Sequence, residues 1–556
     1  MPAEFNVKCL DCSQLSPYIP SVYTCPHCGS AWREAHYDYE TVSKTLLPEL
    51  ARRPFDLWRY HELLPIRTLN RDLSLGEGGT PLIHAVNLGM MLGLPHIYIK
   101  DERQGPTISF KDRQAAVGVV ALKEAGINEI VLASTGNVAI SYSAYAARAG
   151  VKLWAFLTSL VPAEKMREVA LYGTQVVKVT ASYDQAKQVA QEFARQRNLY
   201  YERGAMAITA VEAMKTIGLE IAEQLTWLFG TDDDAPWRAP DWYIQSVSGG
   251  LGPLGILKGY RELRDMGWVK RMPAIANIQT EGCAPMVHAW KQNLEEAEPV
   301  RSPRTHIATL STGAPGRTYT LLQKWMKQSG AGGTFESVTD EEAFRTMHIL
   351  AKMEGISVEP AAAVAFAGLI KMARGGQLSP EQVIVVNCTG HTIPIERTIL
   401  GEGWARNVVL SPQALRETPE EGLLAALSRL SPDRYPRVAI VDDTPDARRL
   451  IRRILQSQGD FTLIEATNGR EAIDLARREL PDLMILDLMM PEVDGFGVLD
   501  ALKQNPETAS IPVIVVTAKE LTKEERERLE GRIHSLMQKG EFLNDELLDE
   551  VRSLVK

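Results

Sequence analysis

The residues best suited to chemistry lie in a few short polar stretches, and one of these stretches holds a lysine. Lys111 lies within TISFKDRQ, residues 107–114, between an apolar pair and an acid–base pair. A lysine amine can attack a carbonyl carbon and form a covalent intermediate, although most lysines are solvated surface charges. The stretch alone leaves both interpretations of Lys111 open.

Three further stretches each follow a run of apolar residues typical of a β-strand. STGNVAIS, residues 134–141, opens a predicted helix whose unpaired N–H groups suit an anion such as a substrate carboxylate. VSGGLGPLG, residues 247–255, has four glycines that let backbone amides approach a phosphate. CTGHT, residues 388–392, adds the Thr389 hydroxyl. Each stretch alone could be an ordinary turn, but with Lys111 they supply what a pyridoxal phosphate site needs.

The cysteines point to a metal site near the N-terminus. Four of the six lie in CLDC, residues 9–12, and CPHC, residues 25–28. Two Cys-x-x-Cys pairs can direct four thiolates at one ion, which is the arrangement of a structural zinc site. We therefore expect Zn²⁺ to be bound by four ligands: Cys9, Cys12, Cys25 and Cys28. Reduced thiols without a metal are the alternative.

The order of apolar runs predicts the fold class and the domains. Residues 41–405 alternate β-rich runs with Ala-rich helical patterns, which predicts βαβ units on a mostly parallel sheet. The pattern lapses at 406–436, which we interpret as a linker. Residues 437–556 alternate five strands with helices, so we expect a doubly wound α/β domain there.

The bulk properties exclude some functions. A chain of 556 residues is too long for one hydrophobic core. Its formal net charge of -9 disfavours binding to nucleic acid through bulk charge. The N-terminus lacks a basic stretch followed by an apolar core, and we find no run of about 18 apolar residues. We expect a cytoplasmic protein with neither nucleic acid nor membrane as a partner.

Five motifs resemble those of threonine synthases, in the order that this family shows. They are GEGGTPL (76–82), SFKDR (109–113), ASTGN (133–137), SGGLG (248–252) and CTGH (388–391). The resemblance covers nearly all of residues 1–405 and implies a fold-type II pyridoxal phosphate lyase with two α/β lobes. Some members of the family carry an N-terminal zinc ribbon, so residues 1–40 are expected to form one.

The resemblance implies a role for each matching residue. Lys111 would form the Schiff base with the cofactor and, once displaced by the substrate, act as general base and acid. Asn137 would bind the ring oxygen of the cofactor, and Thr389 would face its pyridine nitrogen. Ser134 and Thr135 would bind the substrate. The phosphate would be held by Ser248, Gly249, Gly250, Leu251 and Gly252.

One stretch departs from the family pattern where the substrate would be bound. The family shows Asn-Pro-x-Arg-x-Glu-Gly-x-Lys-Thr, and here AITAVEAMKT places Ala207 and Ala210 where Asn and Arg grip the phosphate of O-phosphohomoserine. Arg148 or Arg317 could supply a replacement charge. The expected reaction is O-phospho-L-homoserine plus water to L-threonine plus phosphate. The alternatives are elimination or β-replacement on another amino acid, or a weakly catalytic signalling scaffold.

Residues 437–556 resemble a response-regulator receiver domain, which has a flavodoxin-like (βα)₅ fold. The motifs are VDDTPD (441–446) and LDLMMPEVDG (486–495), followed by a hydroxyl and a lysine on later strands. Carboxylates at the ends of adjacent strands can gather round one Mg²⁺. The residues concerned are Asp442, Asp443, Asp487, Met489, Thr517 and Lys539.

Their roles follow from the resemblance. Asp487 would accept the phosphoryl group, and Asp443, Asp487 and the Met489 carbonyl would bind Mg²⁺, with Asp442 acting through water. Thr517 and Lys539 would contact the phosphoryl oxygens. The expected partner is a sensor histidine kinase, and phosphorylation would regulate the enzyme. A homodimer is the default for both families. An acidic loop without phosphorylation is the alternative.

Overall fold

The computed structural model describes residues 5–158, 161–179, 183–232, 234–391, 436–458, 461–519, 521–539, 547, 550–551 and 553–555. The chain divides into two units, each treated by itself: residues 1–86, 94–347 and 357–394, and residues 87–93, 348–356 and 395–556. The predicted boundary at 405 and nearly all of the predicted linker 406–436 lie outside the described residues, so the domain boundaries stay predictions.

A small antiparallel sheet begins the first unit. Its strands are β1 (Phe5–Cys9), β2 (Leu15–Ser16) and β3 (Arg33–Tyr37), in the order β2-β1-β3. The helix α1 (Tyr39–Leu50) follows, and the Asp38 side chain caps it by accepting from the backbone N–H of Thr41. The two cysteine pairs lie on the turns of this sheet.

The larger sheet of the unit has six strands in the order β12-β11-β10-β13-β5-β4, and only β4 runs antiparallel. Its strands are β4 (Leu82–His84), β5 (Ile97–Asp101), β10 (Trp242–Ser246), β11 (Ala274–Thr280), β12 (Gly333–Val338) and β13 (Ile384–Cys388). The helices that follow its strands are α3 (Lys111–Glu124), α8 (Leu251–Asp265), α9 (Pro285–Lys291), α10 (Arg317–Ser329) and α12 (Pro360–Arg374). The carboxyl ends of the parallel strands lead into the polar stretches identified above.

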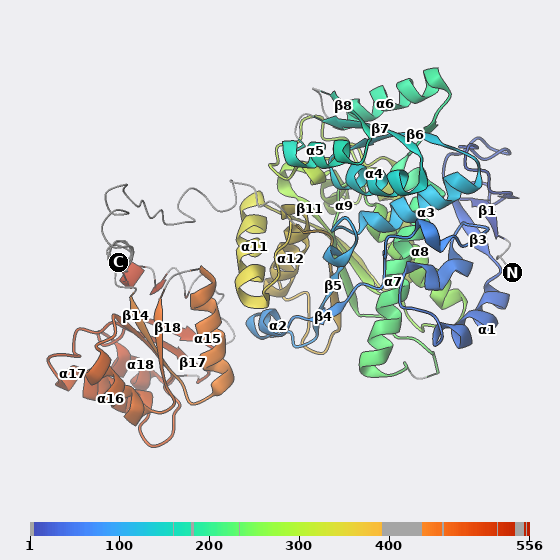
Figure 1. The fold of residues 1–556 in the computed structure, drawn as a ribbon. Coiled ribbons are helices and arrows are strands. Elements are labelled where there is room, and N and C mark those ends of the chain that lie inside the picture. The colour runs from blue at the N-terminus through green and yellow to red at the C-terminus, as the bar shows by residue number, and fades with distance from the viewer. Residues whose placement is uncertain are drawn as a thin grey trace, which may run out of the picture. The chain divides into compact units, whose positions relative to one another are not determined.

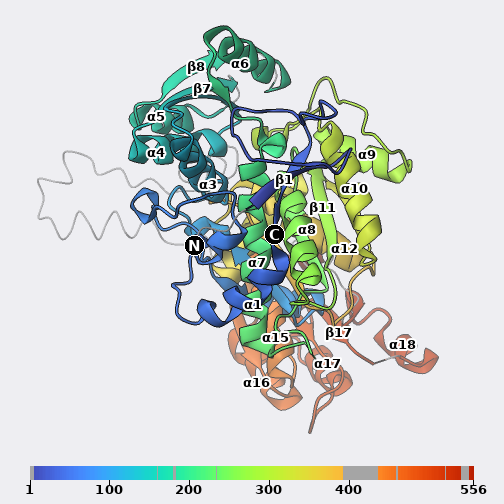
Figure 2. The ribbon, with the colours of Figure 1, turned by 90° about the vertical axis from the view of Figure 1, so that its right-hand side faces the viewer.

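The smaller sheet has four parallel strands in the order β8-β7-β6-β9. They are β6 (Glu129–Ser134), β7 (Lys152–Thr158), β8 (Gln175–Val179) and β9 (Tyr200–Tyr201). The helices α4 (Asn137–Ala149) and α5 (Ala163–Leu171) cover one face, and α6 (Tyr183–Arg197) covers the other (Figures 1 and 2). These two sheets form the two α/β lobes expected from the sequence.

The helix α7 (Ile208–Phe229) lies at the centre of the first unit and packs against α3 and α8. Residues 208–225 are buried throughout, so this helix shows no polar face. A helix buried on all sides must pair every charge that it carries. Those charges form the contacts that hold the N-terminal sheet.

Four buried charges join α7 and α8 to β3. Glu212, Lys215, Lys258 and Glu262 are each at most 1% exposed. Lys215 lies 2.5 Å from Glu212 and 2.7 Å from Glu262, and Lys258 lies 2.5 Å from Glu262. The Ala35 N–H donates to Glu212 over 3.1 Å, and Lys258 donates to the Ala35 carbonyl over 2.9 Å. The N-terminal sheet is thereby fixed to the central helices.

The second unit contains a five-stranded parallel sheet in the order β15-β14-β16-β17-β18. Its strands are β14 (Arg437–Val441), β15 (Thr462–Ala466), β16 (Leu483–Leu486), β17 (Val513–Thr517) and β18 (Ser535–Gln538). The accompanying helices are α15 (Pro445–Gln458), α16 (Gly469–Glu479), α17 (Gly495–Gln504) and α18 (Lys523–Leu529). Within the described residues, this unit also contains α2 (Val86–Leu92), whose first residue belongs to the other unit, and the end of α11 (Asp340–Glu354).

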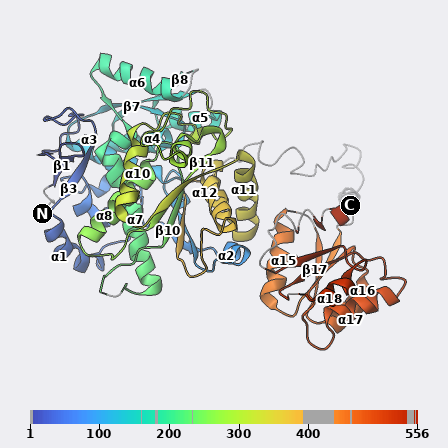
Figure 3. The ribbon, with the colours of Figure 1, turned by 180° about the vertical axis from the view of Figure 1, so that it is seen from behind.

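Alternate residues of β14 serve the two faces of this sheet. The helix α15 lies on one side of the sheet, and α16 and α17 lie on the other (Figure 3). Val438 and Ile440 belong to the apolar cluster that includes residues of α15, whereas Ala439 and Val441 belong to the cluster that includes residues of α16 and α17. This alternation follows from the two-residue period of a strand buried on both faces. The predicted doubly wound α/β fold is confirmed.

In the part of the chain that the structure describes, no helix has both the length and the apolar character needed to span a bilayer.

The buried charge network makes a prediction about stability. The substitution Lys258→Met leaves Glu262 and Glu212 short of positive charge in a buried site, so we expect the free energy of unfolding to fall by about 3–5 kcal/mol. Urea unfolding followed by tryptophan fluorescence measures this change. Lys44→Met is the control, because the side chains of Lys44 and Glu40 are 70% and 81% exposed. Equal urea midpoints for Lys258→Met and the unsubstituted protein would show that the network contributes nothing.

Candidate functional site

The lysine of SFKDR is the first residue of α3, and a backbone pairing fixes its position. Ile108 has a φ of 55°, and the chain turns sharply before Lys111. The Phe110 N–H donates to the Thr389 carbonyl over 3.1 Å, and the His391 N–H donates to the Ile108 carbonyl over 3.0 Å. The turns that carry Lys111 and Thr389 are therefore held side by side, although the two residues are 278 positions apart in the sequence.

The residues that follow Lys111 stabilise this turn. Asp112 accepts from the Thr107 backbone N–H over 2.9 Å, which closes the loop onto the start of α3. Burial raises the pKa of Asp112 to about 6. Arg113 is buried and pairs with Glu102 at 2.7 Å and Glu220 at 2.6 Å.

Glu220 forms ion pairs with two buried cations near the site. Besides Arg113, it pairs with Lys100 at 2.7 Å and accepts from the Gly79 N–H over 3.0 Å. Burial alone would raise the pKa of Glu220, but the two cations outweigh it and lower that pKa to about 2. Gly79 has a φ of 61°, and a Cβ there would lie 1.8 Å from the Phe55 carbonyl oxygen, so only glycine fits. The GEGGTPL stretch thus supports α7 and α3.

A cavity of about 650 Å³ opens above Lys111. A cavity of this size can hold a cofactor together with a small substrate. All but one of the predicted cofactor and substrate residues line it: Lys111, Thr135, Asn137, Ser248, Gly249, Gly250, Leu251, Gly252 and Thr389. The structure therefore brings together loops that follow four different strands.

Ser134 is the predicted substrate residue that does not line the cavity. Its side chain is buried, and its Oγ accepts from the backbone N–H groups of Gly136 and Ala139 at 3.0 and 3.2 Å. The hydroxyl thus holds the loop before α4, whose neighbouring residue Thr135 lines the cavity. Binding of substrate by Ser134 stays a prediction.

The loop between β10 and α8 fits a phosphate. Gly250 has a φ of 84°, which favours glycine, and a Cβ on Gly252 would lie 2.2 Å from the Gln245 Nε2. A Cβ on Gly249 would meet only Thr312, at 4.0 Å, so the loop has room on this side. Ser248 is fixed by a 2.6 Å hydrogen bond between its Oγ and the Thr312 Oγ1. The amides at the start of α8 can therefore receive an anion at the cavity edge.

Two residues beside Asn137, Glu359 and Lys165, were not predicted from the sequence. Asn137 donates to Glu359 over 2.8 Å, and Lys165 donates to the Asn137 Oδ1 over 3.0 Å. Lys165 also lies 3.3 Å from Glu359, which lines the cavity. The sequence signal for Glu359 is its place before Pro360 at the start of an Ala-rich helix, and that pattern predicts only a helix start.

The amine of Lys111 has an altered acidity. Burial lowers the pKa of Lys111 to about 8, although the negative charge of Glu359 acts in the opposite direction. The amine lies 3.9 Å from the centre of the Phe110 ring. A lysine with this pKa is partly neutral near pH 7, which a nucleophile or proton carrier requires.

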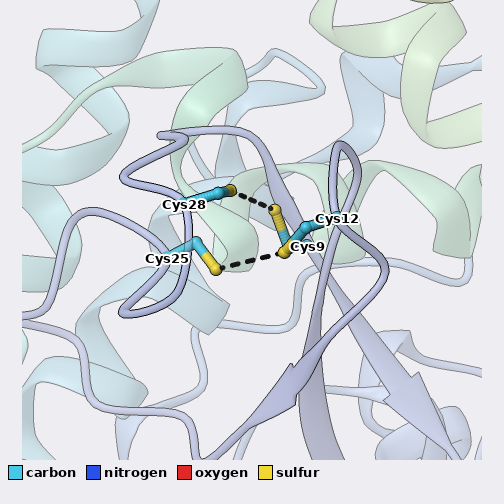
Figure 4. Close-up of side chains that lie close together, drawn as sticks. All are labelled: Cys9, Cys12, Cys25 and Cys28. Atoms are coloured by element: carbon cyan, nitrogen blue, oxygen red, sulfur yellow. Dashed lines mark hydrogen bonds between the residues drawn. The ribbon is translucent and has the colours of Figure 1, made fainter.

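The four N-terminal cysteines meet at one point (Figure 4). Their sulfur atoms all lie within 4.8 Å of one another, with Cys9 3.5 Å from Cys28 and Cys12 3.7 Å from Cys25. All four are free thiols. Four thiolate donors around one point form the ligand set that zinc prefers. His27 is exposed and is not among the clustered residues.

The acidic residues of the second unit also meet. One carboxylate oxygen from each of Asp442, Asp443 and Asp487 lies within 4.8 Å of the others. The Lys539 amine lies 2.6 Å from Asp442 and 2.5 Å from Asp487. Burial opposes the charged amine, but these contacts outweigh it and raise the pKa of Lys539. Burial also raises the pKa of Asp442.

The remaining predicted receiver residues lie at the same edge of the sheet. Met489 is 55% exposed, and its N–H donates to the Asp487 Oδ1 over 3.2 Å. Thr517 ends β17, and its carbonyl accepts from the Lys539 N–H over 2.8 Å. Oxygen ligands in this arrangement suit Mg²⁺.

The lowered pKa of Lys111 predicts how its reaction with the cofactor depends on pH. We expect cofactor-free protein to incorporate pyridoxal phosphate covalently at a rate that rises with pH and is half-maximal near pH 8, because only the neutral amine attacks. Borohydride trapping followed by peptide mass spectrometry measures the rate at Lys111. Lys111→Ala is the control and should show no adduct on this peptide. A midpoint near 10.5, the ordinary lysine value, would contradict the burial effect.

Comparisons with known proteins agree with this geometry. The family model described as pyridoxal-phosphate dependent enzyme matches residues 73–390, and that described as response regulator receiver domain matches residues 438–552. A threonine synthase of Methanocaldococcus jannaschii is 34% identical over 386 residues, which cover 69% of this chain and 91% of the relative. A threonine synthase of Methanosarcina acetivorans is 31% identical over 71% of this chain and 94% of the relative.

A threonine synthase of Mycobacterium tuberculosis is 29% identical over 359 residues, which cover 64% of this chain and 93% of the relative. Both matched families agree with the α/β folds described above, and the four clustered cysteines fit the expected zinc ribbon. The chain therefore belongs to the pyridoxal-phosphate dependent enzymes, with threonine synthases as its relatives, and carries a C-terminal response regulator receiver domain.

Proposed function

We propose that this protein converts O-phospho-L-homoserine and water into L-threonine and phosphate, and that phosphorylation of its receiver domain sets the rate. One observation carries the proposal: Lys111, Asn137, Thr389 and the loop 248–252 line a single cavity. The similarity to threonine synthases along almost the whole length of those relatives supports the choice of reaction.

Pyridoxal phosphate, when bound, withdraws electrons from the α-carbon of an amino acid. The residues of this chain bind the group and move protons. The backbone N–H groups of Gly249–Gly252 would hold its phosphate at the N-terminal end of α8, where the helix dipole favours an anion. Thr389 would offer a neutral hydroxyl to the ring nitrogen, which leaves that nitrogen less protonated than a carboxylate would. Asn137 would donate to the ring oxygen.

Lys111 would carry the protons of the reaction. Because burial lowers its pKa to about 8, the amine can accept a proton from the substrate and return it near neutral pH. Thr135, together with the N–H groups at the start of α4, would bind the substrate carboxylate. The turn shared with Thr389 would keep the amine at one position during these transfers.

The two metal clusters complete the proposal. Cys9, Cys12, Cys25 and Cys28 would hold one structural Zn²⁺, because four protein ligands leave no position for a substrate. In the receiver domain, Asp443, Asp487 and the Met489 carbonyl would hold Mg²⁺, with Asp442 acting through water.

Phosphorylation would act on the contacts of Lys539. A sensor histidine kinase would supply the phosphoryl group to Asp487. Phosphorylated Asp487 would present new oxygens to Lys539 and Thr517, so Lys539 must give up its contacts of 2.5 and 2.6 Å to the two carboxylates or rearrange them. This exchange would connect phosphorylation to the conformation of the domain.

A second candidate function keeps the cofactor and changes the substrate. Ala207 and Ala210 are 3% and 0% exposed and are not among the residues that line the cavity. The family's grip on phosphate is therefore absent at these positions. This observation favours elimination or β-replacement on another amino acid as the alternative.

The proposed reaction predicts a dependence on Lys111. We expect purified protein loaded with pyridoxal phosphate to form threonine and phosphate from O-phospho-L-homoserine. Lys111→Ala should lower kcat by about 10²–10⁴-fold, because a general acid–base is lost. Threonine is followed by chromatography and phosphate by a colorimetric assay.

Lys123→Ala is the matched control, since Lys123 lies on the same helix and donates to Asn128 outside the cavity. Failure of the folded, cofactor-loaded protein to form threonine, with turnover of another amino acid, would replace the proposed reaction by the second candidate.

The proposed regulation predicts a response to phosphorylation. With acetyl phosphate and Mg²⁺, we expect an acid-labile phosphoryl group on Asp487 and a change in the rate of threonine formation of about fivefold or more. Asp487→Asn should abolish both effects. Asp474→Asn is the control, because Asp474 is exposed on α16, away from the acidic cluster. Phosphorylated protein with an unchanged rate would reject regulation of the enzyme by its receiver.

A further inference from the structure

Among the described residues that line the cavity, four have cationic side chains: Lys111, Lys187, Arg203 and Arg317. Lys187 pairs with Asp184 at 2.5 Å, and Arg317 forms two contacts with Asp11. Lys111 has its own part in the proposed chemistry. Within the described residues, Arg203 has no carboxylate at ion-pair distance. Its Nε is buried and has no hydrogen-bond partner. Apart from Lys111, Arg203 is therefore the cation of this group that forms no ion pair with the described residues.

Tyr23, in the loop before β3, and Met206 hold the Arg203 guanidinium in place. The Nη1 donates to the Tyr23 carbonyl over 3.2 Å, and the Nη2 donates to the Met206 carbonyl over 3.4 Å. The guanidinium carbon lies 4.3 Å from the centre of the Tyr23 ring. These contacts use two of the five N–H groups and fix the plane of the fork. The second N–H group of each Nη atom can bind an oxyanion with little loss of entropy.

The neighbouring carboxylate does not neutralise this arginine. Glu202 accepts from the Gly204 N–H over 3.0 Å and lies 3.5 Å from the Tyr200 hydroxyl. Burial raises the pKa of Glu202, against the effect of Arg203 and these hydrogen bonds. The Glu202 carboxylate is thus engaged by its own segment, and the Arg203 guanidinium keeps Nη N–H groups that a ligand can use.

The position of Arg203 complements the missing family residues. Arg203 lies four residues before Ala207, on the segment that leads into α7. Ala207 precedes α7 and Ala210 lies in its first turn; both are buried and neither lines the cavity. The segment therefore presents its cation from the loop before the helix.

We propose that Arg203 binds an oxyanion at the end of the substrate's side chain and makes the enzyme selective for amino acids with an anionic tail. The inference rests on the proposed function, because it takes the cavity to be the substrate site. A phosphate ester and a carboxylate share this chemistry, and the experiment separates them. Arg203 is a specificity-determining residue in this account.

The test measures binding without turnover. Cofactor-loaded protein is titrated with three amino acids of similar length, and the change in cofactor absorbance gives each Kd. The ligands are L-2-amino-5-phosphonopentanoate, L-2-aminoadipate and the neutral L-norvaline. We expect Arg203→Gln to weaken binding of the preferred anionic ligand about 10- to 100-fold, with norvaline unchanged, because a charge-assisted contact is lost. The tighter of the two anions identifies the tail as phosphate-like or carboxylate.

Three further variants make the result decisive. Arg203→Lys keeps the charge but loses the planar fork, so we expect an intermediate loss and a folded protein. Arg317→Gln removes a cation already paired with Asp11 and should cost less than Arg203→Gln. Arg148→Gln, outside the cavity, is the unchanged control.

The proposal is overturned if Arg203→Gln and Arg203→Lys bind all three ligands like the unsubstituted protein, or weaken norvaline equally. It is also overturned if the anion preference depends on Arg317 instead. Because the assay needs no product, a protein that makes no threonine but shows an anion preference dependent on Arg203 would reject the proposed reaction and support this inference.

Discussion

The cavity depends on the backbone pairing between the turn of Lys111 and the turn of Thr389. Two hydrogen bonds of about 3 Å join these turns, and they bring a nucleophilic amine and a hydroxyl from distant parts of the chain to one place. Arg113 secures the other side of the turn through buried pairs with Glu102 and Glu220. Removing one partner of such a pair leaves an uncompensated charge, which costs about 3–5 kcal/mol. The paired turns therefore fix the position of Lys111 at the cavity, and its removal from water lowers its pKa.

The N-terminal sheet is part of this arrangement and not an appended module. Its strand β3 is bonded to the charged network of α7 and α8, and α8 begins at the loop proposed to hold the phosphate. The loops between its strands contribute Trp32 to the cavity, pair Asp11 with Arg317, and support Arg203 through Tyr23. Loss of order around the cysteines would therefore change the cavity and also lower the stability of the fold.

Sequence patterns predicted the parts of the site that are local in the chain. Lys111, Asn137 and the glycine loop each follow a strand, so they were singled out by the rule that sites lie beyond the carboxyl ends of strands. The structure brings them to one cavity, and their roles stay predictions. The alternation of strands and helices is also local in the chain, and it predicted both α/β units. Glu359 and Arg203 could not be found this way, because their roles arise from packing between distant segments. Ser134 is the opposite case: it belongs to a predicted motif, but its hydroxyl accepts hydrogen bonds from its own loop and does not line the cavity.

A crystal structure of the protein grown with pyridoxal phosphate would show directly whether Lys111 holds the cofactor. We predict continuous electron density from the Lys111 Nζ to the cofactor, a phosphate enclosed by residues 248–252, and the Thr389 hydroxyl beside the ring nitrogen. A cofactor bound elsewhere, or a cavity whose Lys111 stays unmodified at saturating pyridoxal phosphate, would contradict it.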